Sequence, residues 1–182
     1  EVVERRRQET EMFCGQVFKV VSDKNAGMVT WLRVYSGALT QGQSVLNSSR
    51  DKVERIGRIM VMHAQQKYEI ATATAGAIVA VTGLKSVRTG DTLCDRMNPI
   101  VLGAFVVPEP VLSVAIEPVS RIDQDRLAGA LYKSALEDPS LKVSTDVDSG
   151  QTLLSGMGEL HLDIVVSRLR SEHNVSVRTG KP

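Results

Sequence analysis

The alternation of apolar and polar residues changes character halfway along the chain. From Met12 to about Asp95, short β-branched or alternating runs are separated by turn residues, among them Asp23–Gly27. The runs that predict strands are 13–21, 28–35, 44–46, 55–62 and 76–81. The last run is nearly all apolar, as expected of a strand buried on both faces. Many short strands joined by glycine turns favour a closed β-barrel, because closure removes exposed strand edges.

The second half predicts two helices between four strands. Runs 111–116, 142–147, 152–154 and 175–177 are typical of strands. The first helix is expected to begin after Ser120, with Asp123 in capping position, and to end at Pro139. Its apolar face is Leu127, Ala130, Leu131 and Ala135, and that of the second helix is Leu162, Val165, Val166 and Leu169. The order βαββαβ predicts a ferredoxin-like domain with both helices on one face of an antiparallel sheet.

Prolines mark the passage between the two halves. Pro99, Pro108 and Pro110 each disfavour helix and interior strand. We therefore expect a tail or linker over 1–11, an all-β barrel over 12–97, a linker over 98–109 and an α+β ferredoxin-like domain over 110–182. Both ends of the chain are expected to lie within a longer protein.

The amino-acid composition limits the class of protein but does not identify a binding partner. Twenty-two basic and twenty-one acidic residues leave a net charge of +1, which neither favours nor excludes nucleic acid. No apolar run approaches the roughly 18 residues that a membrane span requires, so no membrane partner is expected. Cys14 and Cys94 are far apart and belong to no CxxC motif. They argue against a disulfide scaffold or a zinc site and favour a reducing, cytoplasmic compartment.

The turn Gly156-Met157-Gly158 precedes the second helix and has two interpretations. It is suited to an anion nest at a helix N-terminus, but such a glycine pair is more often a tight strand-to-helix turn. The neighbouring Glu159, His161 and Asp163 do not converge on a metal, because residues two apart point to different sides of a helix. With no carboxylate three or four residues away, His161 is expected to pack or to line an interface.

A loose basic run, Lys52, Arg55 and Arg58, follows one predicted hairpin. It fits a solvated sheet edge and it fits contacts to RNA phosphates, and the sequence leaves both open. The strands of the second half lack the exposed aromatics of a base-stacking RNA module. The chain contains no GxxxxGK[ST], HExxH or GxSxG motif. We expect no catalytic, cofactor-binding or metal-binding residue in it.

Several short segments of the sequence resemble those of one protein family, and they occur in the same order as in that family. They are Leu32-Arg33-Val34-Tyr35-Ser36-Gly37, Glu54-Arg55-Ile56-Gly57-Arg58, Gly90-Asp91-Thr92-Leu93, Glu137-Asp138-Pro139 and Ser155 to Leu162. From about Met12 to Pro182 the chain resembles the second and third domains of elongation factor G, a translational GTPase. The fold that this resemblance implies agrees with both halves of the pattern analysis.

The resemblance implies a monomeric cytoplasmic factor that couples GTP hydrolysis on the ribosome to movement of transfer and messenger RNA. GTP and Mg would bind an N-terminal domain of the parent protein, which also has further C-terminal domains. The barrel would contact small-subunit ribosomal RNA, and Lys52, Arg55 and Arg58 are candidates for that contact. The ferredoxin-like domain would contact the GTPase domain, a small-subunit protein and the C-terminal domains. Residues implied to face the GTPase domain and the antibiotic fusidic acid are Gly156, Gly158, Leu160, His161, Val165 and Arg168.

Three departures from the family pattern leave related functions open. They are Ser167, His173 and the Lys24-Asn25-Ala26 turn. A paralogue for ribosome recycling and a protein that protects ribosomes from tetracycline would share both domains. A parent protein that no longer hydrolyses GTP would be a ribosome-binding module without enzyme activity. An intact or degraded GxxxxGK[ST] motif upstream would separate the enzyme from the binder.

Overall fold

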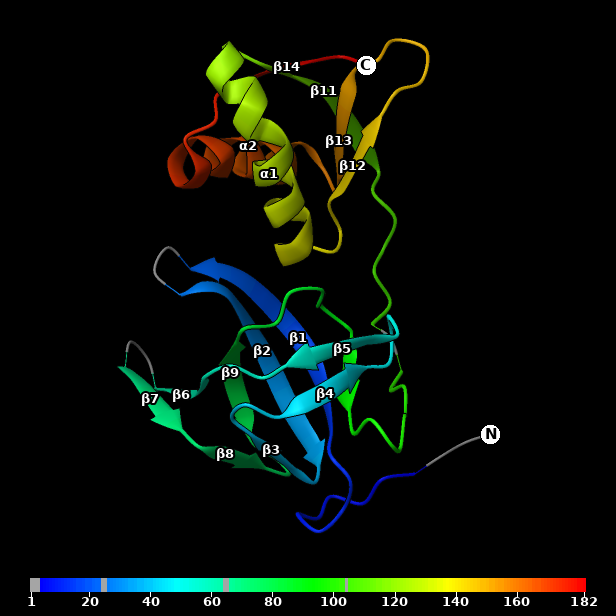
Figure 1. Ribbon diagram of the computed structural model, residues 1–182. Coiled ribbons are helices and arrows are strands. Elements are labelled where there is room, and N and C mark those ends of the chain that lie inside the picture. The colour runs from blue at the N-terminus through cyan, green and yellow to red at the C-terminus, as the bar shows by residue number, and fades with distance from the viewer. Residues whose placement is uncertain (1–3, 24–25, 64–65, 104) are drawn as a thin grey trace. The chain divides into compact units, whose positions relative to one another are not determined.

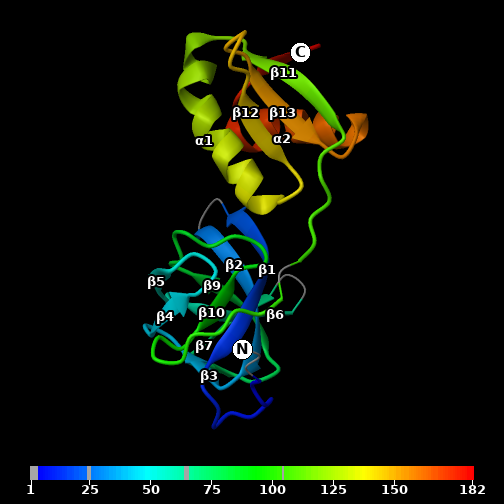
Figure 2. The same ribbon diagram turned by 90° about the vertical axis from the view of Figure 1, so that its right-hand side faces the viewer.

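The computed structural model describes residues 4–23, 26–63, 66–103 and 105–182. The chain divides into two compact units, Glu1–Phe105 and Val106–Pro182. Figures 1 and 2 show the elements of each unit from two directions. Each unit has its own hydrophobic core.

The first unit is built from antiparallel strands. Its main sheet has the order β5-β4-β10-β1-β2-β9-β6-β7, and β3 pairs with β8 beside it. The bounds are β1 Cys14–Asp23, β2 Gly27–Ser36, β3 Ala38–Thr40, β4 Ser44–Asn47, β5 Lys52–Arg55, β6 Ile59–His63, β7 Gln66–Ile70, β8 Thr72–Thr74, β9 Ile78–Thr82 and β10 Thr92–Cys94. The inward side chains of these strands, among them Val17, Leu32, Val79 and Leu93, form one fully buried cluster.

The segment between β5 and β6 closes the sheet into a barrel. β5 lies at one end of the strand order and β6 near the other, so the chain joins the two ends here. Gly57 donates its N–H to the Thr82 carbonyl at 2.8 Å, and Thr82 donates its own N–H to the Arg58 carbonyl at 3.1 Å. A Cβ on Gly57 would lie 2.6 Å from the Thr82 oxygen, so a larger residue does not fit. The predicted barrel is confirmed.

The same glycine corrects one predicted strand. The run 55–62 was expected to be continuous, but β5 ends at Arg55 and β6 begins at Ile59. The backbone of Gly57 turns toward β9 to make the closing hydrogen bond, which interrupts the pairing of the run. In the expected hairpin turn at Asp23–Gly27, residues 24 and 25 lie outside the described part. Ala26 donates its N–H to the Asp23 carboxylate at 2.9 Å.

Residues 98–103, here called the strap, begin the stretch expected to be a linker, and they lie on the barrel. Hydrogen bonds with three neighbouring segments of the barrel fasten them. Ser48 Oγ donates to the Ile100 carbonyl (2.6 Å), the Leu102 N–H donates to Thr92 Oγ1 (3.0 Å), and Gln16 Nε2 donates to the Gly103 carbonyl (2.8 Å). The stretch, which contains Pro99, forms no helix or strand, as predicted, but its polar groups find partners on β1, β10 and the loop after β4.

The second unit has the predicted ferredoxin-like topology. Its elements are β11 Leu112–Pro118, α1 Arg121–Glu137, β12 Lys142–Thr145, β13 Thr152–Gly156, α2 Glu159–His173 and β14 Val177–Gly180. The four strands form an antiparallel sheet in the order β12-β13-β11-β14. Leu131 of α1 and Leu169 of α2 share one core with Ile116 and Leu154 of the sheet, so both helices cover the same face. Neither described helix is long and apolar enough to cross a membrane.

Local signals set most of the helix boundaries. Ser120 caps α1 by accepting the Asp123 N–H at 3.2 Å, as expected. Ala135 is only half-buried, whereas Ser134 turns inward and donates its hydroxyl to the Ala130 carbonyl. The last strand was expected at 175–177 and lies at 177–180 instead. The left-handed Asn174 ends α2, and the N–H of Val175 bonds back to the Leu169 carbonyl, so the strand begins later.

Candidate interaction site

His161 lies in the first turn of α2 and connects two segments of the second unit. Its Nδ1 accepts the N–H of Met157 at 3.0 Å, and its Nε2 lies 2.8 Å from Asp138 Oδ2. Because Nδ1 accepts a hydrogen bond, the ring proton is on Nε2 and is donated to the carboxylate. The side chain therefore fastens the turn before α2 to the end of α1.

Asp138 is the C-cap of α1 and is held as an ionised carboxylate. Its Oδ1 accepts the Ser140 N–H at 2.9 Å and the Ser140 hydroxyl at 2.6 Å. Burial raises the pKa of Asp138, but the hydrogen bonds from Ser140 and then His161 outweigh it and hold that pKa below its usual range. The acceptor that orients His161 is thus itself fixed in place.

The glycine turn before α2 makes room for this histidine. A Cβ on Gly156 would lie 2.8 Å from Nδ1 of His161 and 2.9 Å from Cδ2 of Leu162. Gly158 has no atom within 4 Å of the corresponding position, and it precedes α2 with extended backbone. The Met157 N–H already has a partner, which favours the tight-turn interpretation over an anion nest.

Arg168 forms a second connection between the two helices. Its Nη2 donates to Glu137 of α1 at 2.6 Å, and its Nε and Nη2 each donate to Glu172 at 2.9 Å. These hydrogen bonds, first from Glu172 and then from Glu137, raise the pKa of Arg168 above its already high value. The guanidinium is therefore part of the framework of the unit as well as of its surface.

Apolar side chains next to this framework are exposed. Leu160 is 73% exposed and Ile164, one turn further along α2, is 50% exposed, with Met157 partly exposed before them. We call Met157, Leu160 and Ile164 the α2 surface. Val165, predicted to line the interface, is only 6% exposed and belongs to the core. Of the predicted residues, Leu160 lies on this surface, while His161 and Arg168 connect α2 to the end of α1 and Gly156 makes room for the His161 ring.

The three basic residues of the barrel are all exposed, but they do not share one strand face. Lys52 begins β5, Arg55 ends it, and Arg58 precedes β6. Side chains alternate along a strand, so Lys52 and Arg55 start from opposite faces of β5. Between them Glu54 is buried and accepts the N–H groups of Lys85 and Ser86. In the described part of the chain, no ion pair occupies any of the three cations.

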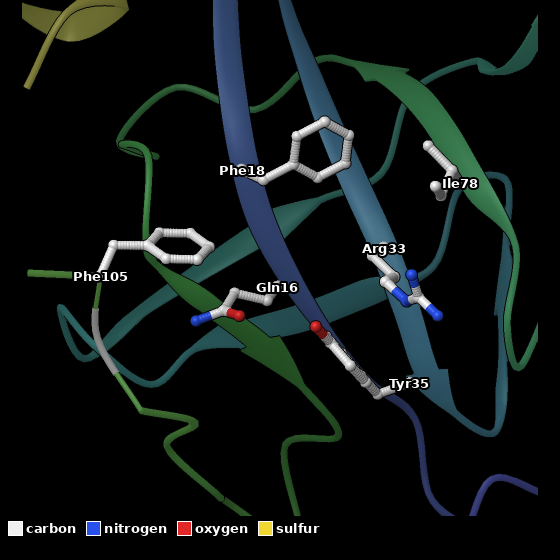
Figure 3. Close-up of a pocket in the computed structure, with 6 residues that line it drawn as sticks. All are labelled: Gln16, Phe18, Arg33, Tyr35, Ile78 and Phe105. Carbon is white, nitrogen blue, oxygen red and sulfur yellow. The ribbon is translucent and has the colours of Figure 1, made fainter.

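A pocket of about 210 Å³ lies on the outer face of the barrel. Figure 3 shows its six lining residues, Gln16, Phe18, Arg33, Tyr35, Ile78 and Phe105. Gln16, Arg33 and Ile78 are direct neighbours across β1, β2 and β9. The Arg33 guanidinium lies 5.5 Å from the centre of the Tyr35 ring, a cation–π arrangement. Sequence reasoning did not identify this pocket, because the residues come from distant segments.

Sequence reasoning also missed Asp138. The sequence next to His161 offers no carboxylate on the same helix face, because the carboxylate comes from the end of α1, 23 positions earlier. The available signal was the Glu137-Asp138-Pro139 stop, whose two acids contact His161 and Arg168 of α2. Among the described residues, no group of three or more His, Cys, Asp and Glu is arranged to hold a metal ion.

Comparison with known proteins assigns both units. The sequence profile of elongation factor G domain 2 matches residues 12–96, and that of Elongation Factor G, domain III, matches residues 107–181. A crystal structure of a protein from Thermus thermophilus superimposes with a TM-score of 0.81 at 33% sequence identity. The match covers 94% of this chain and 26% of that protein, so the chain spans about a quarter of its length. The chain thus belongs to the elongation factor G family and comprises its second and third domains.

Proposed function

We propose that the chain is the ribosome-contacting and coupling part of an elongation factor G-like GTPase that drives GTP-dependent movement of tRNA and mRNA. The observation that carries the proposal is the match of both domains in family order, together with an exposed apolar face on the domain III unit. The chain has no phosphate-binding loop of its own. GTP and Mg are therefore assigned to another domain of the parent.

The α2 surface is proposed to face the GTPase domain. Exposed apolar side chains gathered on one helix face mark a contact that excludes water. The two connections through His161 and Arg168 fix α2 to α1, so force on one helix is passed to the other. A rigid unit of this kind biases a neighbouring switch if it contacts two states of that switch differently. Gly156 and Gly158 belong to the same proposed interface, which is also where fusidic acid would bind.

The barrel is proposed to contact small-subunit ribosomal RNA through Lys52, Arg55 and Arg58. Exposed cations that carry no internal ion pair are available for phosphate oxygens. Such contacts release counterions, so their contribution decreases as salt increases. The parent is proposed to act in the cytoplasm as a monomer, contacting the small subunit and its own GTPase and C-terminal domains.

A toeprint of the intact parent on pretranslocation ribosomes with GTP tests this function. The position of the messenger is read before and after addition of the factor. A shift of one codon is expected of a translocase. Ribosome-stimulated hydrolysis without a shift would assign the parent to ribosome recycling or tetracycline protection. Ribosome binding without hydrolysis would make it a binding module, and either result would overturn the proposal.

A further inference from the structure

The two cysteines of the chain are direct neighbours in the folded barrel. Cys14 near the start of β1 is the cross-strand partner of Cys94 at the end of β10. Both thiols are free and 0% exposed. Their separation in the sequence gave no indication of this contact, because it is created by the antiparallel pairing of the first and last strands of the barrel.

The hydrogen-bond pattern places the pair at the closer type of position in the ladder. Asp95 donates its N–H to the Phe13 carbonyl and Val17 donates to the Asp91 carbonyl, each at 2.9 Å. Hydrogen-bonded and non-hydrogen-bonded pairs alternate along antiparallel strands, so Cys14 and Cys94 form a non-hydrogen-bonded pair. Such pairs have Cα atoms about 4.5 Å apart and side chains on the same face, within the roughly 4.4–6.8 Å that disulfides require.

The pair lies on the outer face of the barrel, beneath the strap. Leu93 belongs to the interior cluster, so its neighbours Thr92 and Cys94 point outward. Thr92 accepts a hydrogen bond from the strap. Gln16 lies on the same outer face as Cys14 and donates a hydrogen bond to the strap. Because both thiols are fully buried on this outer face, the strap fastened to Gln16 and Thr92 is the segment placed to cover them.

Arg5 lies beside the covered thiols. Its Nη2 donates to the Asn98 carbonyl of the strap at 3.2 Å, and its Nε is buried without a partner in the described part of the chain. Burial, and then Cys94, raise the pKa of Cys14 to about 11, while Arg5 acts in the opposite direction. While it is buried, the Cys14 thiol stays protonated. Relief of that burial would leave the Arg5 guanidinium nearby to stabilise a Cys14 thiolate.

We propose that Cys14 and Cys94 are an oxidation site that forms a reversible disulfide with a low-molecular-weight disulfide such as oxidised glutathione. One protein thiolate attacks a sulfur of the small disulfide, forming a mixed disulfide and releasing one small thiol. The second protein thiolate then attacks the protein sulfur of the mixed disulfide and releases the second small thiol. Two protein thiols are oxidised and one small disulfide is reduced to two thiols, with the protons passing to the released thiolates.

The disulfide would tie together the two points where the chain enters and leaves the barrel. It closes a loop that contains every strand from β1 to β10, and cross-links of long loops restrict the unfolded chain most. The oxidised barrel is therefore more resistant to unfolding than the reduced one. Because the strap covers both sulfurs, its opening sets the rate of oxidation without changing the product.

The test uses the full chain in glutathione buffers from reducing to oxidising. Remaining thiols are blocked with an alkylating reagent and counted by intact mass, and linked peptides are mapped after digestion. We expect monomers that lose both thiols together, a link between the Cys14 and Cys94 peptides, reversal by dithiothreitol, and a higher denaturation midpoint of the oxidised barrel in Trp31 fluorescence. Disulfide-linked dimers, separate glutathione adducts on the two cysteines, or persistence of both thiols in the most oxidising buffer would overturn the proposal.

Two variants keep the test independent of folding defects. Cys94→Ser leaves Cys14 without its partner, so oxidation should stop at a glutathione adduct that the wild-type chain does not accumulate. Gln16→Ala removes one fastening of the strap and should speed disulfide formation several-fold with the same linked product. An unchanged rate in Gln16→Ala would contradict the covering role of the strap, and absence of the adduct in Cys94→Ser would contradict the exchange route.

Discussion

Gly156→Ala tests the geometry of the His161 site with a single methyl group. The new Cβ would lie 2.8 Å from the His161 ring and 2.9 Å from Leu162, closer than such atoms approach in proteins. The ring must move, which weakens its hydrogen bonds to Met157 and to Asp138. One neutral hydrogen bond and one to a partly exposed carboxylate are together worth about 2 kcal/mol, so we expect the second unit to lose about that much stability.

Gly129→Ala is the matched control, because the same methyl group enters open space on the surface of α1. A glycine in a helix interior lowers stability by about 0.5–1 kcal/mol relative to alanine, so this variant should be more stable than the unmodified chain. The two substitutions therefore have opposite predicted signs. Amide exchange at Met157 should quicken in Gly156→Ala only.

Urea unfolding of the chain followed with two probes measures both effects. Both described helices belong to the second unit, so helical circular dichroism reports its unfolding. The single tryptophan, Trp31, belongs to the barrel, so its fluorescence reports the other unit and should not change. If Gly156→Ala is as stable as the unmodified chain, or if Gly129→Ala is less stable, the close packing of Gly156 against His161 does not stabilise the second unit.

Three further predictions follow from charge and packing. The folded pKa of Asp138 lies below its ordinary value of 3.8, so its stabilisation is present above that value and is lost as pH falls through the depressed pKa. Asp138→Asn should remove that part of the acid dependence in circular dichroism, and an unchanged acid transition would contradict it. Gly57→Ala should destabilise the barrel by about 2 kcal/mol in Trp31 fluorescence and leave the helical signal alone. In the intact parent, glutamate at the three barrel cations, Lys52, Arg55 and Arg58, should weaken ribosome binding and flatten its salt dependence, whereas an unaltered salt slope would exclude them from the contact.

Local patterns in the sequence predicted most of the architecture. The apolar spacing of Leu162, Val165 and Leu169 gave the buried face of α2, and the Ser120 cap gave the start of α1. Strand period and glycine turns gave the barrel. These features depend on neighbours within a turn or a strand, which is the range over which propensity and periodicity act.

Contacts between distant segments could not be predicted in this way. The break in the expected strand at Gly57 depends on the Thr82 carbonyl of β9, and the fastening of the strap depends on β1 and β10. Asp138 and His161 meet only because α1 and α2 pack on the same face of the sheet. The family resemblance implied that Val165 faces the GTPase domain, whereas the apolar spacing placed it on the buried face of α2, and the structure agrees with the spacing.

If the α2 surface couples GTP hydrolysis to movement, as we propose, Leu160→Asp in the intact parent should separate the two. Leu160 is 73% exposed, so the substitution should leave the fold intact, and Ile122→Asp on the exposed side of α1 is the control at 64% exposure. Losing the burial of one leucine at an interface costs about 1.5–3 kcal/mol, or roughly tenfold or more in rate. Single-turnover messenger movement and ribosome-stimulated GTP hydrolysis are measured side by side. We expect Leu160→Asp to slow movement about tenfold relative to hydrolysis, while Ile122→Asp behaves as the unmodified parent. Equal rates of movement in all three proteins would contradict a coupling role of the α2 surface.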